Sequence, residues 1–455
     1  MTFLRRLPPR FFLILALSIL GGGLCAVVVP AESREVAQQL VGFPDSDVQA
    51  HQARPVILAG LCFSPALAAC MYALGGTLAR YITRQFLGIF GICLSALFLI
   101  YLLIDLSSRI DDFSNAPHIL RSIGKYYGVS APAILLILLP YTLLLALLHS
   151  LGKFSTNREI IAMIQSGRGV LRITVPLIIT GVFCSLFSLA LNYHWAPSAE
   201  EHQSAVLAAS NHKPARQATQ VLYRNPENRR LWMVGAFPQD YQKGKPLLNV
   251  EVTSTDENQR LLSRLSTASA LWNRSTHQWT FENPVISRYV PGKAPVIERS
   301  EHPLTLDFWS ETPWQLIKPG LDPAHLGVPD LNSWLQAHAR HASFADPAPY
   351  FTQWHYRWAL PFTCLVIVLF ATPLAIHFSR RSTGVGLFLA VILSALLLLV
   401  SNIVLALGEA GLLRPALAAW LPNLLFALLG LYLLQRRITG RPIYHLLLKR
   451  LPAAD

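Results

Sequence analysis

Eight long apolar segments dominate this sequence and limit the folds that it can adopt. A helix needs about 20 apolar residues to cross a hydrocarbon core about 30 Å thick. Hydrophobic residues make up 53% of the chain and charged residues only 14%, whereas about a quarter of the residues of a soluble domain are charged. The sequence therefore predicts a multi-pass α-helical membrane protein, with spans near 11–29, 56–74, 87–104, 131–148, 171–191, 359–376, 385–407 and 417–434.

The positive charge of the chain, a net +13, gathers beside the ends of these segments. Its clusters fall at alternate ends of successive segments, which predicts that both termini are cytoplasmic. We attribute the basic balance to topology and to contact with anionic lipid headgroups, and we predict no nucleic-acid partner. The main clusters are Arg5, Arg6 and Arg10; Arg80 and Arg84; Lys153, Arg158, Arg168 and Arg172; Arg380 and Arg381; and Arg436, Arg437, Arg441, Lys449 and Arg450.

A polar block at 196–345 separates the first five apolar segments from the last three. Apolar and polar side chains alternate within it at 230–234, 248–252 and 278–282, as in strands that bury one face. Turn-forming residues separate these stretches, which is typical of a sandwich or a jelly-roll. We therefore predict an inserted all-β jelly-roll domain, followed by a short helix at 331–339.

The predicted chain thus has five parts. With cytoplasmic termini, an odd number of spans before the β domain places that domain on the far side of the membrane. The parts are an N-terminal transmembrane hairpin at 1–77, transmembrane helices at 78–193, the β domain at 196–345, transmembrane helices at 350–440 and a cytoplasmic tail at 441–455.

The loop between the fourth and fifth apolar segments predicts a short amphipathic helix, at about 155–167. Ser155 or Thr156 is a candidate cap, and Glu159 falls in the first turn, where a negative charge is favourable. Apolar residues follow at 160, 161, 163 and 164, and Gly167 with Gly169 ends the helix. Membrane packing alone does not require such a helix, so we interpret it as a docking element.

No motif for catalysis or metal binding stands out. The sequence contains neither a phosphate-binding G-x-x-x-x-G-K-[ST] loop nor H-E-x-x-H nor G-x-S-x-G. We interpret His338 and His341 as solvated side chains and Asp45-Ser46-Asp47 as a chance acidic pattern. All six cysteines lie in apolar segments, where cysteine behaves as a small hydrophobe. We therefore predict no catalytic residue, no metal and no cofactor in this chain.

Charges near the membrane have two open interpretations. Asp105 and Arg109 lie one helical turn apart at the outer end of the third segment. They form either an interfacial ion pair worth a few tenths of a kcal/mol or an anion-contacting arginine at the mouth of a cavity, because ionisable groups in spans usually face protein or water.

From residue 78 to about 437 the chain resembles the permease subunits F and G of the lipopolysaccharide-export ABC transporter. The segment 78–87 (LARYITRQFL) is similar to the family's opening before its first span. The segment 151–167 (LGKFSTNREIIAMIQSG) is similar to the family's coupling helix. The order of three spans, a β jelly-roll and three spans also fits, which makes six family spans plus an N-terminal hairpin of two.

This resemblance implies an inner-membrane transport subunit without catalytic residues of its own. It implies a second permease of the same family, a cytoplasmic ATPase dimer, a periplasmic bridge protein and lipopolysaccharide as partners, with the β domain in the periplasm. Glu159 would contact an arginine of the ATPase, together with Arg158, Ile160 and Met163. Arg109, with Asp105 and Leu102 beside it, would meet lipid phosphate at a gate between 87–108 and 385–407.

Two alternatives stay open. The two apolar segments before residue 78 depart from the family pattern, and they are either an accessory hairpin or a sign that translation starts at Met71. A membrane-anchored periplasmic scaffold or sensor that binds a partner through its β domain is the alternative function, although a scaffold has no use for a coupling helix. The sequence does not separate an F-like from a G-like subunit.

Overall fold

The computed structural model describes residues 9–439 with short gaps. The predicted tail at 441–455 lies outside the described residues, as do Asp45, Ser46 and His341. The gaps are 41–46, 115–117, 211–215, 226–227, 239–240, 242–243, 257–259, 274–275, 291, 308, 310, 318–319, 341–345 and 377–382.

Eight helices in the described part of the chain are long and apolar enough to cross a membrane, and each coincides with one of the predicted apolar segments to within a residue at either end or extends beyond it. The multi-pass helical fold is therefore confirmed. The helices are α1 (Pro9–Leu40), α2 (Val48–Leu74), α3 (Thr77–Ser114), α4 (Ile119–Thr156), α6 (Val170–Tyr193), the continuous pair α10 (Ala348–Ala359) and α11 (Thr363–Ala375) joined by η5 (Leu360–Phe362), α12 (Thr383–Glu409) and α13 (Pro415–Ile438).

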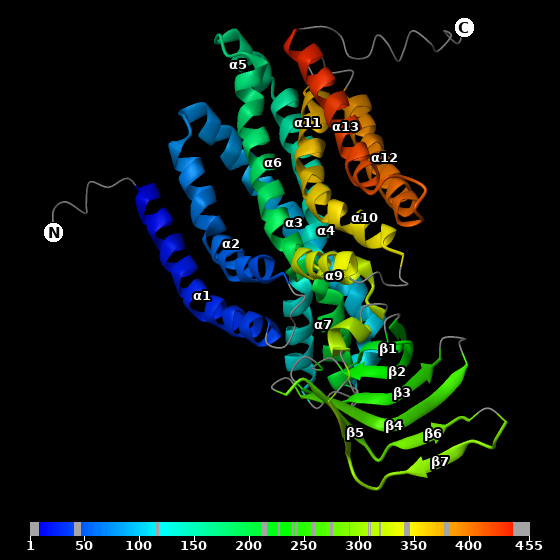
Figure 1. The fold of residues 1–455 in the computed structure, drawn as a ribbon. Coiled ribbons are helices and arrows are strands. Elements are labelled where there is room, and N and C mark those ends of the chain that lie inside the picture. Colours follow the sequence, from blue (N-terminus) through cyan, green and yellow to red (C-terminus); the bar gives the residue numbers. More distant parts are fainter. Residues whose placement is uncertain are drawn as a thin grey trace, which may run out of the picture.

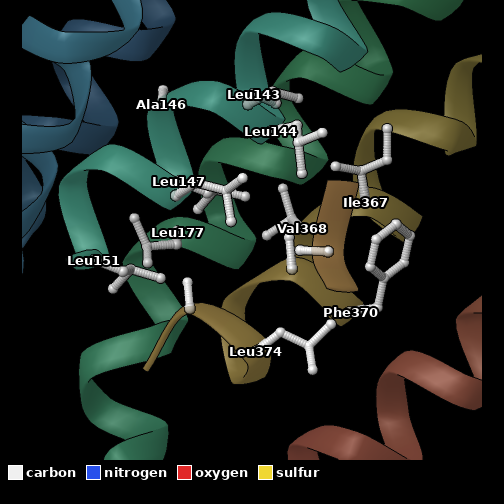
Figure 2. Close-up of a cluster of buried hydrophobic side chains, with 14 of the residues drawn as sticks. Leu143, Leu144, Ala146, Leu147, Leu151, Leu177, Ile367, Val368, Phe370 and Leu374 are labelled. Atoms are coloured by element: carbon white, nitrogen blue, oxygen red, sulfur yellow. The ribbon is translucent and has the colours of Figure 1, made fainter. Parts of the chain in front are cut away.

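The membrane core is centred on three of these helices, α4, α6 and α11. Leucine side chains of α4 and α6 interdigitate with Val368, Phe370 and Leu374 of α11 (Figure 2). The Val368 side chain packs directly on the backbone of α6 here, since a Cβ atom added at Gly181 would lie 2.9 Å from a methyl of Val368. Buried apolar contacts at this density fix the positions of the spans relative to one another.

The polar block forms an antiparallel β sheet with the order β1-β2-β3-β4-β5-β8, and β6 pairs with β4 and β7. Its alternation is as predicted: Trp232, Val234 and Ala236 are buried, whereas Met233 between them is exposed. The inserted β domain is therefore confirmed. The strands are β1 (Arg216–Asn225), β2 (Arg230–Pro238), β3 (Leu247–Thr255), β4 (Leu261–Asn273), β5 (Gln278–Glu282), β6 (Val285–Arg288), β7 (Val296–Arg299) and β8 (Leu304–Leu306).

The second layer of the β domain differs from that of a jelly-roll. A jelly-roll stacks two sheets, but the described strands form one sheet, and its buried face packs against short helices. These helices are α8 (Pro313–Ile317), η4 (Pro323–His325) and α9 (Val328–Arg340). Trp314, Leu331 and Trp334 complete the core around the sheet's Trp232 and Trp279. The apolar periodicity predicted one buried face correctly, but it could not say what covers that face.

The short helix α5 (Glu159–Gln165) and the β domain lie at opposite ends of the helical bundle (Figure 1). At the β end, α7 (Trp195–Ser210) links α6 to β1 and packs beside α4. Its Val206 shares a small apolar cluster with Phe113 of α3 and Tyr126 of α4. The α1–α2 hairpin lies along one flank of the bundle (Figure 1).

Candidate functional site

The predicted docking helix exists, but it begins later than the sequence suggested. Helix α4 continues to Thr156, so Ser155 and Thr156 end one helix rather than cap the next. The Thr156 hydroxyl donates to the carbonyl of Lys153, 3.0 Å away. Arg158 is the residue before α5, in the left-handed region with φ 57°, and its side chain makes no cap hydrogen bond. The predicted cap is therefore wrong, because α4 is longer than its apolar segment.

The end of α5 is as predicted. Gly167 has φ +82°, a conformation that glycine adopts without steric cost. Its amide donates to Ile164 O at 3.0 Å, and the Arg168 amide donates to Met163 O at 3.2 Å. These two bonds form a Schellman motif, so the chain reverses sharply into α6.

The apolar face of α5 holds the helix on the bundle. Ile160 is fully buried, and Met163 and Ile164 pack against the membrane core. That core includes Ile82 and Phe86 of α3 at this position. Ile160 was expected among the ATPase contacts, but a buried side chain cannot meet another protein. It can influence coupling only through the position of α5.

Glu159 is oriented by two neighbours at the start of α5. The Tyr81 hydroxyl of α3 donates to Glu159 Oε2 at 2.9 Å, and the Asn157 amide donates to Oε1 at 3.1 Å. Neither neighbour carries a charge, and each carboxylate oxygen has a further lone pair that can accept a hydrogen bond. Arg158 beside it is exposed. The site therefore presents an anchored carboxylate next to an exposed arginine.

Tyr81 is a contact that sequence reasoning missed. It lies in the predicted opening segment before the first family span, but nothing in the spacing indicates that it reaches a residue 78 positions away. Its ring also lies 6.0 Å from that of Phe154 at the end of α4. The start of α3, the end of α4 and α5 thus form one unit.

At the outer end of α3, Asp105 and Arg109 form the ion pair that the spacing allowed. Arg109 Nε lies 3.2 Å from Asp105 Oδ1, and its guanidinium lies 5.5 Å from the centre of the Tyr126 ring. The Tyr127 hydroxyl donates to Asp105 Oδ2 at 3.1 Å. The Arg109 side chain is still 37% exposed, so part of the cation can meet an anion. Leu102, one turn below Asp105, is half-buried.

The two helices expected to form the gate are lightly packed against the rest of the chain. We compare the most apolar stretch of 18 residues in each described span. In α3 none of these residues is buried, and in α12 17% of them are buried. The corresponding fraction is 72% in α10–α11. Large apolar side chains such as Leu103, Ile104 and Leu399 are exposed. These faces of α3 and α12 are available to lipid or to a second protein.

Within the described residues, no three histidine, cysteine, aspartate or glutamate side chains are close enough together to hold a metal ion. Asp47, from the acidic pattern noted in the sequence, caps α2 instead, since its carboxylate accepts from the Ala50 amide at 3.2 Å. For His338 the structure describes only the backbone, in helix α9.

Residues 80–436 match the family model described as lipopolysaccharide export system permease LptF/LptG. The match covers the spans from α3 to α13, helix α5 and the whole β domain, and it excludes the α1–α2 hairpin. No curated protein matches the chain.

Proposed function

The chain belongs to the lipopolysaccharide export permease family LptF/LptG, and from this premise we propose a specific role for it. It is a non-catalytic permease subunit of an ABC transporter. It extracts lipopolysaccharide from the inner membrane and passes it to a periplasmic bridge. The main support for this proposal is the family match over most of the chain. The matched region includes the spans from α3 onward, α5 and the β domain, which are the parts of one transport subunit.

The geometry of α5 supports coupling to a cytoplasmic ATPase dimer. The helix is rigidly seated through Ile160, and Glu159 is presented with a fixed orientation by Tyr81 and Asn157. A charge-assisted hydrogen bond to an arginine is stronger than a neutral one and has directional geometry. A partner that pushes on Glu159 therefore moves α3 through Tyr81, and not only α5.

The unburied faces of α3 and α12 support a lateral gate for lipid. Such helices can separate without leaving backbone polar groups unsatisfied, since each helix satisfies its own. We propose that α3 of this chain faces α12 of a second permease. Arg109 then lies at the outer end of the gate helix, where its exposed edge can contact a lipid phosphate while Asp105 limits its mobility.

The placement of the β domain opposite α5 supports a periplasmic position for it (Figure 1). An ATPase binds in the cytoplasm, so a domain at the other end of the bundle lies across the membrane. The basic clusters predict the same sidedness. The scaffold alternative explains the β domain but leaves α5 and its oriented carboxylate without a role.

The direct test is ATP-dependent release of lipopolysaccharide. The full chain is co-expressed with the family ATPase and second permease of its own genome, and the complex is reconstituted with lipopolysaccharide. We expect extraction by a soluble bridge-type acceptor only with ATP and only when this chain is present. A complex that assembles and hydrolyses ATP but releases the same amount of lipid without this chain would refute the proposal.

A further inference from the structure

A buried polar cluster joins the α1–α2 hairpin to the base of the β domain. It lies where α2 begins, where α6 ends and where α9 begins. We call it the junction cluster; its members are Asp47, His51, His194, Asp330, Asn332 and Ser333. Asp47 and His51 come from the hairpin and lie more than 280 positions from their partners in α9. The large majority of polar side chains in such positions have a hydrogen-bond partner.

The hairpin contributes specific hydrogen bonds to this cluster. The Asp47 amide donates to Ser333 Oγ at 3.0 Å. The Asp47 carboxylate accepts from the Asn332 side-chain amide, also at 3.0 Å. In addition, the Tyr193 hydroxyl at the end of α6 donates to Ala50 O at 2.9 Å. The first turn of α2 is therefore fixed to both α6 and α9.

Asp330 lies between two histidines from different parts of the chain. Its Oδ1 lies 3.9 Å from His51 Nε2, and its Oδ2 lies 3.6 Å from His194 Nδ1. Burial alone would raise the pKa of the Asp330 carboxyl, but the close approach of His194 and the nearby His51 and Arg54 hold that pKa well below its usual range. Asp330 therefore stays charged, and removing its partners would leave a buried charge uncompensated.

The two helices of the hairpin, α1 and α2, also contact each other close to the cluster. Arg54 Nη2 of α2 lies 2.6 Å from Glu32 Oε1 of α1, and both side chains are at most 10% exposed. A Cβ atom added at Gly21 of α1 would lie 2.7 Å from Cys62 O of α2. The two helices therefore approach closely, and the hairpin can act as one body.

Helix α9 connects this cluster to the β domain. Its Leu331 and Trp334 are fully buried in the core of the β domain, whereas Asp330 and Ser333 contact the hairpin. The Trp334 ring stacks on Tyr350 of α10 at 3.5 Å. Asn332 accepts from Trp354 Nε1 of α10 at 2.5 Å. Whatever holds α9 therefore holds the β domain against the spans.

Elsewhere the hairpin makes little contact with the bundle. Only 6% of the most apolar stretch of α1 is buried, and the same fraction of α2. The family match begins after the hairpin, at residue 80. We propose that the α1–α2 hairpin is a built-in subunit that binds the permease through the junction cluster and clamps α9, and with it the β domain, to the spans. This inference does not depend on what the permease transports.

The test uses the full chain with a specific protease site inserted between Gly75 and Gly76 and an affinity tag at the C-terminus. A Cβ atom at Gly76 would meet nothing within 4 Å, so an insertion has room there. After purification and cleavage, we expect the hairpin fragment to stay bound to the tagged remainder. Loss of the fragment from the parent chain on cleavage would overturn the docking proposal.

Two variants and a matched control locate the interaction. Asp330→Asn removes the charge that lies between the two histidines, and Asp47→Ala removes the carboxylate that accepts from Asn332. Each should release the cleaved hairpin at least roughly thirtyfold faster, because losing one partner of a buried, charged hydrogen-bonded contact mainly accelerates dissociation. Asp346→Asn changes a carboxylate that accepts a hydrogen bond from the neighbouring Ala348 amide, and it should retain the hairpin. Equal retention in all variants would refute the cluster's role. Uncleaved samples confirm that each variant folds.

Hydrogen exchange tests the clamp itself. In the parent, displacing the cleaved hairpin with high salt or mild heat should speed amide exchange across Val328–Leu335, because α9 loses its partners on one face. Unchanged exchange after the hairpin has left would show that it docks without clamping.

Discussion

The helical bundle has a carboxylate at each end, Glu159 and Asp330, and the two differ in exposure and in the groups around them. At the α5 end, Glu159 is held by two uncharged groups and is only partly shielded. At the β end, Asp330 lies among two histidines and Arg54, and its side chain is 13% exposed. An accessible carboxylate with two neutral partners can accept a further partner, whereas a buried one that lies between two histidines and near Arg54 is already engaged within its own chain.

This difference separates a contact site from a structural joint. Changing Glu159 should alter what the protein does with little effect on its folding. Changing Asp330 should alter how firmly the parts hold together. The following predictions test that separation.

The largest expected effect is on transport. Glu159→Lys replaces the proposed acidic contact by a like charge for an ATPase arginine, so lipopolysaccharide export should be abolished. The substitution is at a partly exposed position, and stability should change by only about 0.5 kcal/mol. Export and membrane abundance are measured in the same cells. Normal export, or loss of the protein from the membrane, would contradict the assignment of Glu159 as a contact site.

The next effect is on stability and depends on pH. Asp330→Asn should cost about 3 kcal/mol near neutral pH, because it removes one partner of a buried charge cluster. The folded-state pKa of Asp330 lies below that of the unfolded chain, which is about 3.9. The stabilisation is therefore complete above about pH 5 and is lost as the pH falls through the folded-state value.

This loss of stabilisation at low pH is measured as the difference in melting temperature between the parent chain and Asp330→Asn. The difference should be large at about pH 5 and should shrink toward about pH 3, because Asp330 of the unfolded chain takes up a proton in this range while the folded carboxyl stays ionised. A difference that is constant across this range would mean that the charge of Asp330 is not what stabilises the junction.

A smaller effect is expected from Tyr81. Tyr81→Phe keeps the ring beside Phe154 and removes only the hydroxyl that orients Glu159. One such hydrogen bond is worth about 1 kcal/mol, so export should fall about fivefold while the ATPase still binds. Tyr141→Phe, at an exposed ring of α4, is the matched control. If Tyr81→Phe and Tyr141→Phe export equally well, then Glu159 does not depend on Tyr81.

The sequence was sufficient for features that depend on local periodicity. Apolar segments of span length located all eight helices, and period-two alternation located the buried face of β2. Gly167 predicted the end of α5, and in the structure it adopts the left-handed conformation there. In each case the signal and the structure lie within a few residues of each other.

The sequence was insufficient where distant segments meet. Asp47 looked like part of a chance acidic pattern and nothing in the sequence singles out His51, and only the fold brings them to Asp330 and Ser333. The apolar face of α5 looked like a docking surface, yet Ile160 is buried in the chain's own membrane core. Ile178, which its position in α6 suggests would face lipid, packs against the membrane core, whereas Leu186 of the same helix is exposed.

The smallest expected effect concerns the gate, where the lipid is held neither by a cluster of charged residues nor by a tightly packed contact. Acyl chains make many weak contacts, so no single substitution in α3 should abolish transport. Photo-crosslinkers at Leu102 and at Arg109 should nevertheless capture lipopolysaccharide, because both positions lie on the sparsely buried helix α3 near the outer end of the span. Leu186, a residue of α6 that is 58% exposed, is the control for general lipid contact and should capture several-fold less. Asp105→Asn should then increase capture at a crosslinker placed at Leu102, since Arg109 would be freed from its ion partner to hold phosphate. Equal capture at Leu102, Arg109 and Leu186 would mean that the gate lies on another face of the bundle.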